Sequence, residues 1–482
     1  MDEVNVGASS LRRVDARFLL PLFPETAVVL HPAWLEGLQQ AGIRIVEPGQ
    51  GPAPDLVVAP ANLRDAALRV GASMVLLDGR PRRGFGVRAY PEVRRFLPIR
   101  TRSGAIVIAD PSHGRVAERA IALGTHAGNM RAATKRELAR VLVRFRLLPP
   151  ILPMYTVHSH SSTTPALVRE AARQAGVEVG GWFLLIQDGP DHRRLVFFLF
   201  TGRGDAHVVV KFSRLVDDSH KARREARGLE VARAAGAVIA ARAPKVLAEF
   251  EISGHHATVQ TAATGQTLGR TVSARGSRRQ KLSQIETVVD WLCEIARATA
   301  YRRGSVRDDV RETITRRFSG SDTDRLLKIA FAAPAVFQHG DLSDGNVIVD
   351  GEDFVAVDWE LARADGFPLW DLICVAVCTL PLLDRGLYEK SAQREDEHVR
   401  HLGDLFRGRA ASSAAFLGWL RSVADASGVD ATVVPEIVTL WFLWYSEQWA
   451  GWAPLERFTL EWLTNPELGM SWPLWRDSSS GS

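Results

Sequence analysis

The chain has 482 residues, of which 46% are hydrophobic and 24% are charged. This length corresponds to two or three domains, and the composition excludes a wholly disordered chain. Sixty basic against 55 acidic side chains give a net charge of +5, and the arginines are scattered. We therefore do not expect a nucleic-acid partner.

The N-terminal sequence, the apolar stretches and the cysteines predict a cytoplasmic protein. The N-terminal segment is acidic before its short apolar run, which prolines interrupt, so it does not resemble a signal peptide. The longest apolar stretch, residues 372–383, is too short to cross a bilayer and contains Pro381. Cys293, Cys374 and Cys378 form no CxxC pair, which is typical of reduced core thiols.

Residues 1–150 begin with short apolar runs that alternate with helical segments. This alternation predicts a small parallel α/β layer of the Rossmann or methyltransferase type. The expected strands are residues 27–30, 43–46, 56–59, 74–77 and 105–109. A dinucleotide or methyl-donor site would need glycine after the first strand, where His31 and Pro32 stand. We expect a layer without a cofactor, serving as a scaffold or as a surface for a protein partner.

An arginine-rich stretch and a double proline follow within this region. Residues 80–83 read Arg-Pro-Arg-Arg, with Arg94, Arg95 and Arg100 further on. They suit a solvated surface or, alternatively, a site for an anionic group such as phosphate. A helix over 130–146 should end at Pro149 and Pro150, where we place a domain boundary. His158 and His160 lack nearby partner ligands and are interpreted as linker residues.

From residue 165 onward the pattern changes. A helix over 165–175 precedes three candidate strands, 182–186, 195–200 and 207–212, which turns join into an antiparallel meander. An amphipathic helix is expected over 219–235, then a β-branched run at 257–260. Beyond about residue 280 the sequence is mostly helical. The predicted domains are therefore 1–150, 151–262 and 263–482.

The strongest chemical signal lies between residues 338 and 360. The segment Gln-His-Gly-Asp-Leu-Ser-Asp-Gly-Asn places Asp341 and Asn346 before a short strand, and Asp358 follows a second strand. A loop and a strand pair of this kind bring a carboxylate base and two oxygen ligands to one point. That set suits Mg²⁺, which takes few carboxylates and shares its coordination shell with phosphates and water.

This motif resembles the aminoglycoside phosphotransferase and choline-kinase-like family, relatives of the protein kinases, over about residues 165–400. The resemblance implies an α+β, two-lobed kinase-like fold, with an antiparallel sheet lobe plus a helical lobe and ATP between them. Matched to the family's motif, Asp341 is the catalytic base, and Asn346 and Asp358 are the Mg²⁺ ligands. His339 and Asp371 are structural members that hold the loop.

The nucleotide site follows from the same resemblance. Lys211, one of only seven lysines, corresponds to the strand lysine that contacts the α- and β-phosphates. Glu225 corresponds to its helix partner, with Glu230 as the alternative on the same helix. Gln260 to Ala262 would form the hinge that meets adenine. The turn at 187–194 has one glycine rather than GxGxxG, so the phosphate-loop residues stay unassigned, and no P-loop motif is present.

Eight of the thirteen tryptophans lie from Trp419 onward. Their helical spacing predicts a core-facing stripe or, alternatively, a wall of the acceptor pocket. An acidic run at Glu389, Glu395, Asp396 and Glu397 suits an exposed helix or loop, so a cationic aminoglycoside acceptor should not be assumed. The overall prediction is an ATP- and Mg²⁺-dependent phosphotransferase acting on a small-molecule hydroxyl of a sugar, amino-sugar, amino-alcohol or related compound. The alternative is a pseudokinase that binds nucleotide and recruits a partner.

Overall fold

The computed structural model separates into two compact units. The sheet unit comprises residues 1–223 and 245–262, and the helical unit comprises residues 224–244 and 263–482. Within them the structure describes residues 19–20, 23–40, 42–49, 52–70, 72–79, 92–100, 106–109, 114–124, 154–159, 164–186, 194–201, 206–213, 219–274, 276–386, 392–448, 453–465, 467–469, 472 and 475.

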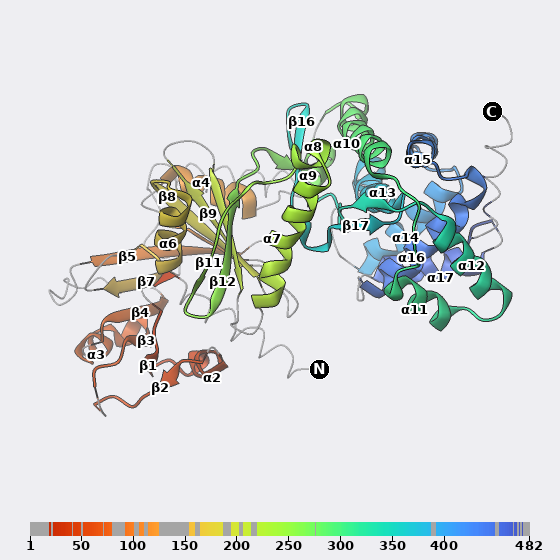
Figure 1. The fold of residues 1–482 in the computed structure, drawn as a ribbon. Coiled ribbons are helices and arrows are strands. Elements are labelled where there is room, and N and C mark those ends of the chain that lie inside the picture. Colours follow the sequence, from red (N-terminus) through yellow and green to blue (C-terminus); the bar gives the residue numbers. More distant parts are fainter. Residues whose placement is uncertain are drawn as a thin grey trace. The chain divides into compact units, whose positions relative to one another are not determined.

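One 12-stranded sheet runs through the sheet unit, in the order β11-β12-β10-β9-β8-β6-β5-β7-β4-β3-β1-β2 (Figure 1). Its strands are β1 (Thr26–Val29), β2 (Arg44–Ile45), β3 (Leu56–Pro60), β4 (Met74–Gly79), β5 (Glu92–Arg100), β6 (Ile106–Ala109), β7 (Met154–Ser159), β8 (Gly181–Ile186), β9 (Arg194–Phe200), β10 (Val208–Ser213), β11 (Val246–Ile252) and β12 (His255–Thr261).

Strands β1 to β4 pair in parallel, as predicted for the front of the chain. Because alternate side chains point to opposite faces, the continuous apolar runs supply two cores. Val57 and Val75 pack with Ala67 of α3 (Arg64–Arg69) on one face. Leu56 and the neighbouring apolar residues pack with Leu38 of α2 (Leu35–Gln40) on the other. This front layer is therefore covered on both sides.

The rest of the sheet is antiparallel. The prediction that residues 105–109 belong to the parallel layer is wrong, because β6 pairs antiparallel with both β5 and β8. Two of its residues, Val107 and Ala109, pack with Phe183 of β8 under α4 (Gly114–Gly124). On the opposite face, α6 (Ala166–Ala175) joins the core that also holds the front layer. Strands before and after residue 150 thus share one sheet and one apolar core.

Several sheet strands lie outside the expected pattern. Strands β5, β7 and β11 were not predicted, and His158 lies in β7 opposite Val75 and Val93, so its interpretation as a linker residue is wrong. The side chains of Arg94, Arg95 and Arg100, and the whole of residues 80–83, 130–146, 149–150 and 160, lie outside the described residues. The arginine-rich stretch therefore remains only a sequence observation.

The helical unit surrounds a core of aromatic side chains. Its helices are α7 (Ser219–Ala234, counted here from Arg224), α8 (Ala237–Ala240), α9 (Leu268–Ser273), α10 (Arg278–Thr299), α11 (Asp308–Arg317), α12 (Ser321–Ala332), α13 (Trp370–Arg385), α14 (Ala392–Phe406), α15 (Ser413–Ser427), α16 (Val434–Gln448) and α17 (Ala453–Thr464). Short strands complete it: β13 (Gln266–Thr267), β14 (Val336–Gln338), β15 (Val347–Asp350), β16 (Asp353–Ala356) and β17 (Arg363–Gly366).

The tryptophan-rich C-terminal region forms this core. Trp441, Trp444 and Tyr445 of α16 are buried, and the centre of the Tyr445 ring lies 4.7 Å from that of Trp441 and 4.8 Å from that of Trp444. The core-facing interpretation of the stripe is confirmed for these residues, whereas Trp449 and Trp452 lie outside the described residues.

Two further predictions concern the cysteines and the possibility of a membrane-spanning helix. All three cysteines are free thiols, as predicted. Within the described ranges, no helix combines the length and apolar character that crossing a bilayer requires. The chain is thus α+β, with a mixed sheet that is antiparallel beyond β4 and with a helical unit, which agrees with the α+β class that the resemblance implied.

Candidate active site

The loop 339–346 joins β14 to β15 in the helical unit, and its backbone is anchored by a buried carboxylate. Asp371 stands in the first turn of α13. Its Oδ2 accepts a hydrogen bond from the His339 amide at 2.6 Å, and its Oδ1 accepts one from the Gly340 amide at 3.0 Å. Burial raises the pKa of Asp371 to about 6, while the two amide donors act in the opposite direction. This carboxylate fixes where the loop begins.

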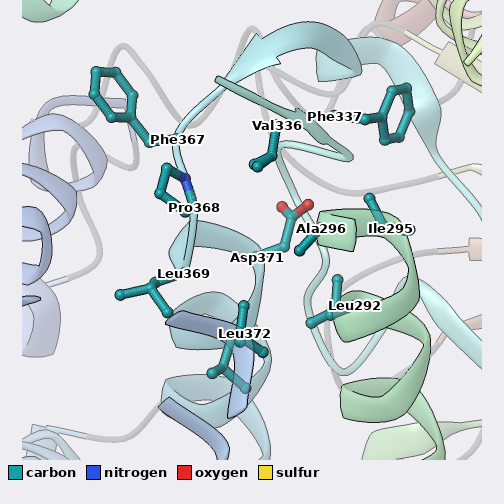
Figure 2. A pocket seen from close by; sticks show the side chains of 11 residues that line it. Leu292, Ile295, Ala296, Val336, Phe337, Phe367, Pro368, Leu369, Asp371 and Leu372 are labelled. Carbon is teal, nitrogen blue, oxygen red and sulfur yellow. The ribbon is translucent and has the colours of Figure 1, made fainter. Parts of the chain in front are cut away.

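Apolar side chains surround Asp371. Figure 2 shows its carboxylate between Ala296 of α10 and Val336 of β14, with Leu369 and Leu372 on its own segment. The cavity that these residues line holds about 20 Å³, which is space for about one water molecule. The carboxylate is therefore a structural anchor in an apolar setting, and this cavity is too small for a metabolite.

His339 and Asn346 hold Asp341. The Asp341 amide donates to Nδ1 of His339 at 3.3 Å, so the other ring nitrogen, Nε2, is the donor to the Val357 carbonyl at 3.1 Å. Nδ2 of Asn346 donates to the Asp341 backbone oxygen at 2.8 Å and to its Oδ2 at 2.9 Å. With Oδ2 held in this way, Oδ1 of Asp341 is the oxygen available to another donor.

Asp358 adopts a strained backbone conformation next to this loop. Its φ of 71° and ψ of 60° lie in the left-handed region, which costs a non-glycine residue free energy and is often found at functional sites. Burial and the negative charge of Asp358 raise the pKa of Asp341 to about 7. Glu360 adds to this repulsion. Three acidic side chains, Asp341, Asp358 and Glu360, are therefore close together and half-buried.

This donor set fits a magnesium ion. Asp358 supplies a carboxylate, and because the Asn346 nitrogen donates to Asp341, its Oδ1 is the amide oxygen left as an acceptor. In the described part of the chain, no group of three or more His, Cys, Asp or Glu side chains forms a metal cage. A site with few carboxylates is what Mg²⁺ uses when phosphates complete its shell. The repulsion between Asp341 and Asp358 is what a divalent cation would relieve.

Glu225 lies on a helix that approaches this site very closely. A Cβ on Gly228 of α7 would stand 1.8 Å from the Trp359 carbonyl oxygen, so only glycine fits there. Glu225 precedes Gly228 by three residues, which places both on one side of the helix. Glu225 is fully buried, whereas Glu230 is exposed. Gly228 was missed from the sequence, where it looked like an unfavourable helix residue.

Three further residues that shape the loop were also missed. A Cβ on Gly340, whose φ is 89°, would lie 2.6 Å from the Leu361 carbonyl oxygen. The Tyr445 hydroxyl donates to the Gly340 carbonyl. A Cβ on Gly269 of α9 would lie 1.9 Å from Oδ2 of Asp344. Gly269 and Asp344 are 75 positions apart in the sequence, and Gly340 and Tyr445 are 105 apart. The need for glycine at 269 and 340 therefore comes from tertiary contacts, which no local sequence pattern indicates.

The other predicted site residues belong to the sheet unit. Lys211 is half-buried on β10, paired opposite Thr258 of β12. Gln260 of β12 is buried, and its Oε1 has no hydrogen-bond partner among the described residues. The Ala262 amide donates to the His207 carbonyl at 3.0 Å. Lys211 and Glu225 lie in different units, so their pairing stays a prediction. Residues 187–193 lie outside the described residues.

The comparison with protein families addresses this same region. Residues 186–401, which include the loop and both candidate magnesium ligands, match the model of the phosphotransferase enzyme family. This segment is therefore similar to that family. The resemblance inferred from the motif at 338–360 is confirmed, and the matching segment extends from the end of β8 into α14.

Solved structures give weaker matches, and no curated protein matches the chain. A protein described as an aminoglycoside phosphotransferase from Ralstonia eutropha is 14% identical over 64% of this chain and 98% of its own, with a TM-score of 0.38. A type VIII aminoglycoside-3'-phosphotransferase is 19% identical over 50% and 91%, with a TM-score of 0.26. Choline kinase from Cryptosporidium parvum is 12% identical over 60% and 92%, with a TM-score of 0.27.

Proposed function

We propose that the chain is an ATP- and Mg²⁺-dependent phosphotransferase that moves the γ-phosphoryl group to a hydroxyl of a small molecule. The observation that carries this proposal is the state of Asp341. Asn346 fixes one of its oxygens at 2.9 Å, and burial together with Asp358 raises its pKa to about 7. A general base works best when its pKa lies near the working pH and its position is fixed.

Asp341 acts as the base in this proposal. Its Oδ1 accepts the proton of the acceptor hydroxyl, so that the hydroxyl oxygen is oriented for in-line attack. Asn346 and Asp358 would hold Mg²⁺, which when bound supplies positive charge to the phosphates. His339 and Asp371 keep the loop rigid through the bonds to the Val357 carbonyl and to the two loop amides. Asp341 and the metal ligands then need no rearrangement for each turnover.

The nucleotide contacts are proposed from the family resemblance. Lys211 would bind the α- and β-phosphates, and Glu225 would keep its ammonium in place. Gln260 and Ala262 would meet the adenine edge, and the unpartnered Oε1 of Gln260 is suited to accept from an amino group. In this proposal residues 151–262 serve as the small lobe and residues 263–482 as the helical lobe.

We further propose that residues 1–150 form a Rossmann-like scaffold without a nucleotide of its own. The parallel order β2-β1-β3-β4 and helices on both faces support this description, as does the absence of glycine after β1. A thermal-shift measurement with S-adenosylmethionine and NAD at millimolar concentration tests it. We expect no shift, whereas saturation 100-fold above the dissociation constant would add about 2.7 kcal/mol.

An ATP-consumption assay tests the main proposal. Wild-type protein is incubated with Mg·ATP and a panel of hydroxyl compounds, alongside Asp341→Asn. We expect at least one compound to accelerate ATP consumption, and the variant to lower turnover about 10²- to 10⁴-fold with Mg·ATP affinity retained. Turnover of Asp341→Asn within twofold of wild type would remove Asp341 from the role of base. Nucleotide binding without turnover on any acceptor would favour the pseudokinase alternative.

A further inference from the structure

Three arginines gather in the helical unit beside the loop that carries Asp341. Arg303 is only 4% exposed, and its two terminal nitrogens donate to the backbone oxygens of Asp365 at 2.8 Å and Gly366 at 2.6 Å. Its guanidinium carbon lies 4.1 Å from the centre of the Phe367 ring. Arg303 therefore holds the end of β17, the strand that carries the second arginine, Arg363.

Arg307 is also buried and lies immediately before α11. Its Nε donates to Oδ1 of Asp309 at 3.0 Å and its Nη2 to Oδ2 at 2.5 Å. The rings of Phe367, Trp370 and Trp444 have their centres 5.8, 5.7 and 5.4 Å from its guanidinium carbon. Its third nitrogen, Nη1, is buried and has no hydrogen-bond partner among the described residues. The side chain thus retains an unused donor in an aromatic setting.

The positive charges of this cluster exceed the negative charge that meets them. Asp309 pairs with Arg307, lies 3.6 Å from Nη1 of Arg363, and also accepts from the Trp444 indole at 2.9 Å. Asp365 is a second acidic side chain that acts on Arg303 and Arg363, so two carboxylates meet three guanidinium groups. Burial lowers the pKa of Arg363, and so does the neighbouring charge of Arg307. A buried charge without a counter-charge is costly, so this cluster favours a bound anion.

The cluster lies close to the proposed base. The Leu361 carbonyl packs against Gly340, the residue before Asp341, and Arg363 pairs opposite Gln338 across β17 and β14. Three residues of chain span at most about 11 Å, and paired strands lie about 5 Å apart. These limits keep the Arg363 backbone within about 16 Å of the Asp341 backbone. The Arg363 side chain is 33% exposed, so a ligand can reach it.

We propose that the acceptor carries an anionic group, a carboxylate or a phosphate, that binds Arg363 with Arg307 behind it. This inference rests on the proposed phosphotransferase function and narrows its substrate class. Guanidinium groups match the planar oxygens of such anions with paired hydrogen bonds. The excess positive charge repels a quaternary ammonium or a polyamine, so amino-alcohols and aminoglycosides are poor acceptors for this site.

Matched acceptors that differ only in charge test the proposal in the ATP-consumption assay. Glycerol, glycerate and glycerol 3-phosphate form one series, and glucose, gluconate and glucose 6-phosphate form another, with choline and an aminoglycoside as cationic members. We expect an anionic member to have the lowest KM, and the carboxylate and phosphate arms to show which anion is used. Inorganic sulfate should inhibit competitively against the acceptor and not against ATP.

Variants then separate recognition from folding. Arg363→Gln should raise the KM for the anionic acceptor about 10- to 100-fold with a much smaller change in kcat, since it removes a charged hydrogen bond made to the acceptor in both ground and transition states. Arg363→Lys should restore part of that loss. Arg316→Gln is the matched control, because that arginine is 55% exposed and pairs with Glu312 on α11.

Several results would overturn the inference. Preferred turnover of a neutral or cationic acceptor, or an unchanged KM in Arg363→Gln, would reject the anionic acceptor while leaving the phosphotransferase proposal intact. If no compound is phosphorylated and Mg·ATP does not bind, the phosphotransferase proposal fails instead. Calorimetry with sodium sulfate then tests the anion site separately. No sulfate binding to wild type, or equal sulfate affinity in wild type and Arg363→Gln, would reject the proposed anion site.

Discussion

The loop at Asp341 and the arginine cluster are neighbouring regions of the helical unit with opposite electrostatics. In the loop, Asp341, Asp358 and Glu360 repel one another, and burial raises the pKa of Asp341 to about 7. In the cluster, Arg307 and Arg363 share one carboxylate, and burial lowers the pKa of Arg363. The loop therefore gathers acidic side chains, and the cluster gathers basic ones. This difference supports our proposals that the loop binds a cation and that the cluster binds an anion.

The largest expected effect comes from removing a carboxylate from the acidic loop. Asp358→Ala removes the only carboxylate among the proposed magnesium ligands, so we expect Mg²⁺-dependent nucleotide binding to fall below detection in calorimetry. Glu352→Ala, in the exposed turn between β15 and β16, is the matched control and should bind normally. Unchanged Mg·ATP affinity in Asp358→Ala would show that the loop does not hold the metal.

The next effect concerns the anchor of the loop rather than its charge. Asp371→Ala leaves the buried amides of His339 and Gly340 without their acceptor. Each unsatisfied buried amide costs about 1–3 kcal/mol, so we expect the free energy of unfolding to fall by about 2–6 kcal/mol. Asp371→Asn keeps one acceptor oxygen and should lose less. Denaturant titration of the three proteins measures the difference, and equal midpoints would contradict the anchoring role.

A smaller effect is expected at the close approach of α7. Gly228→Ala forces its Cβ toward the Trp359 carbonyl, which requires a shift of the helix and should cost about 1–3 kcal/mol. Gly418→Ala on α15 is the control, since nothing lies within 4 Å of its added Cβ. That change should stabilise the protein by about 0.5–1 kcal/mol. An unchanged or raised unfolding temperature in Gly228→Ala would show that the close approach of α7 does not require glycine.

The last effect is a pH dependence that tests the repulsion directly. The folded-state pKa of Asp341, about 7, lies above its ordinary value of 3.8, so the folded protein binds this proton more tightly. Without metal, stability should therefore fall as pH rises from about 4 to about 7, by at most about 1.4 kcal/mol per pH unit from this group. Asp341→Asn should flatten the curve, and Mg·ATP should do so in wild type.

Other carboxyl groups titrate in the same range, so the comparison between proteins is what counts. Burial also raises the pKa values of Asp344 and Asp371 to about 6. Those groups contribute equally to wild type and to Asp341→Asn. Parallel stability curves for the two proteins would therefore remove Asp341 as the source of the slope.

The sequence predicted the loop of the active site well because its chemistry is local. Asp341 and Asn346 are separated by five positions, and the structure joins them by a 2.9 Å hydrogen bond. The arginine cluster gave no such signal: Arg307 and Arg363 lie 56 positions apart and meet only at Asp309. Among 53 arginines, no spacing rule distinguishes these from solvated ones.

The fold likewise has parts that the sequence predicted and parts that it did not. The parallel strands β1 to β4 were predicted from uninterrupted apolar runs, since both of their faces are buried. Strand β11 was missed although Val246–Ile252 alternates between half-buried and exposed residues, a pattern that a period-two count would have found. Strand β5 contains several arginines and Pro98, so its sequence does not indicate a strand in the interior of a sheet.

The position of β6 between β5 and β8 has a consequence for engineering and expression. A fragment beginning at residue 151 would lose β6 and leave the backbone amides and carbonyls of β8 unpaired along a strand that reads Gly-Trp-Phe-Leu-Leu-Ile. Long, flat, apolar edge strands of this kind recruit other chains. Phe183, which packs against Val107 and Ala109 in the intact chain, would face water. Such a fragment should aggregate, so the kinase-like region cannot be isolated by cutting the chain at the double proline.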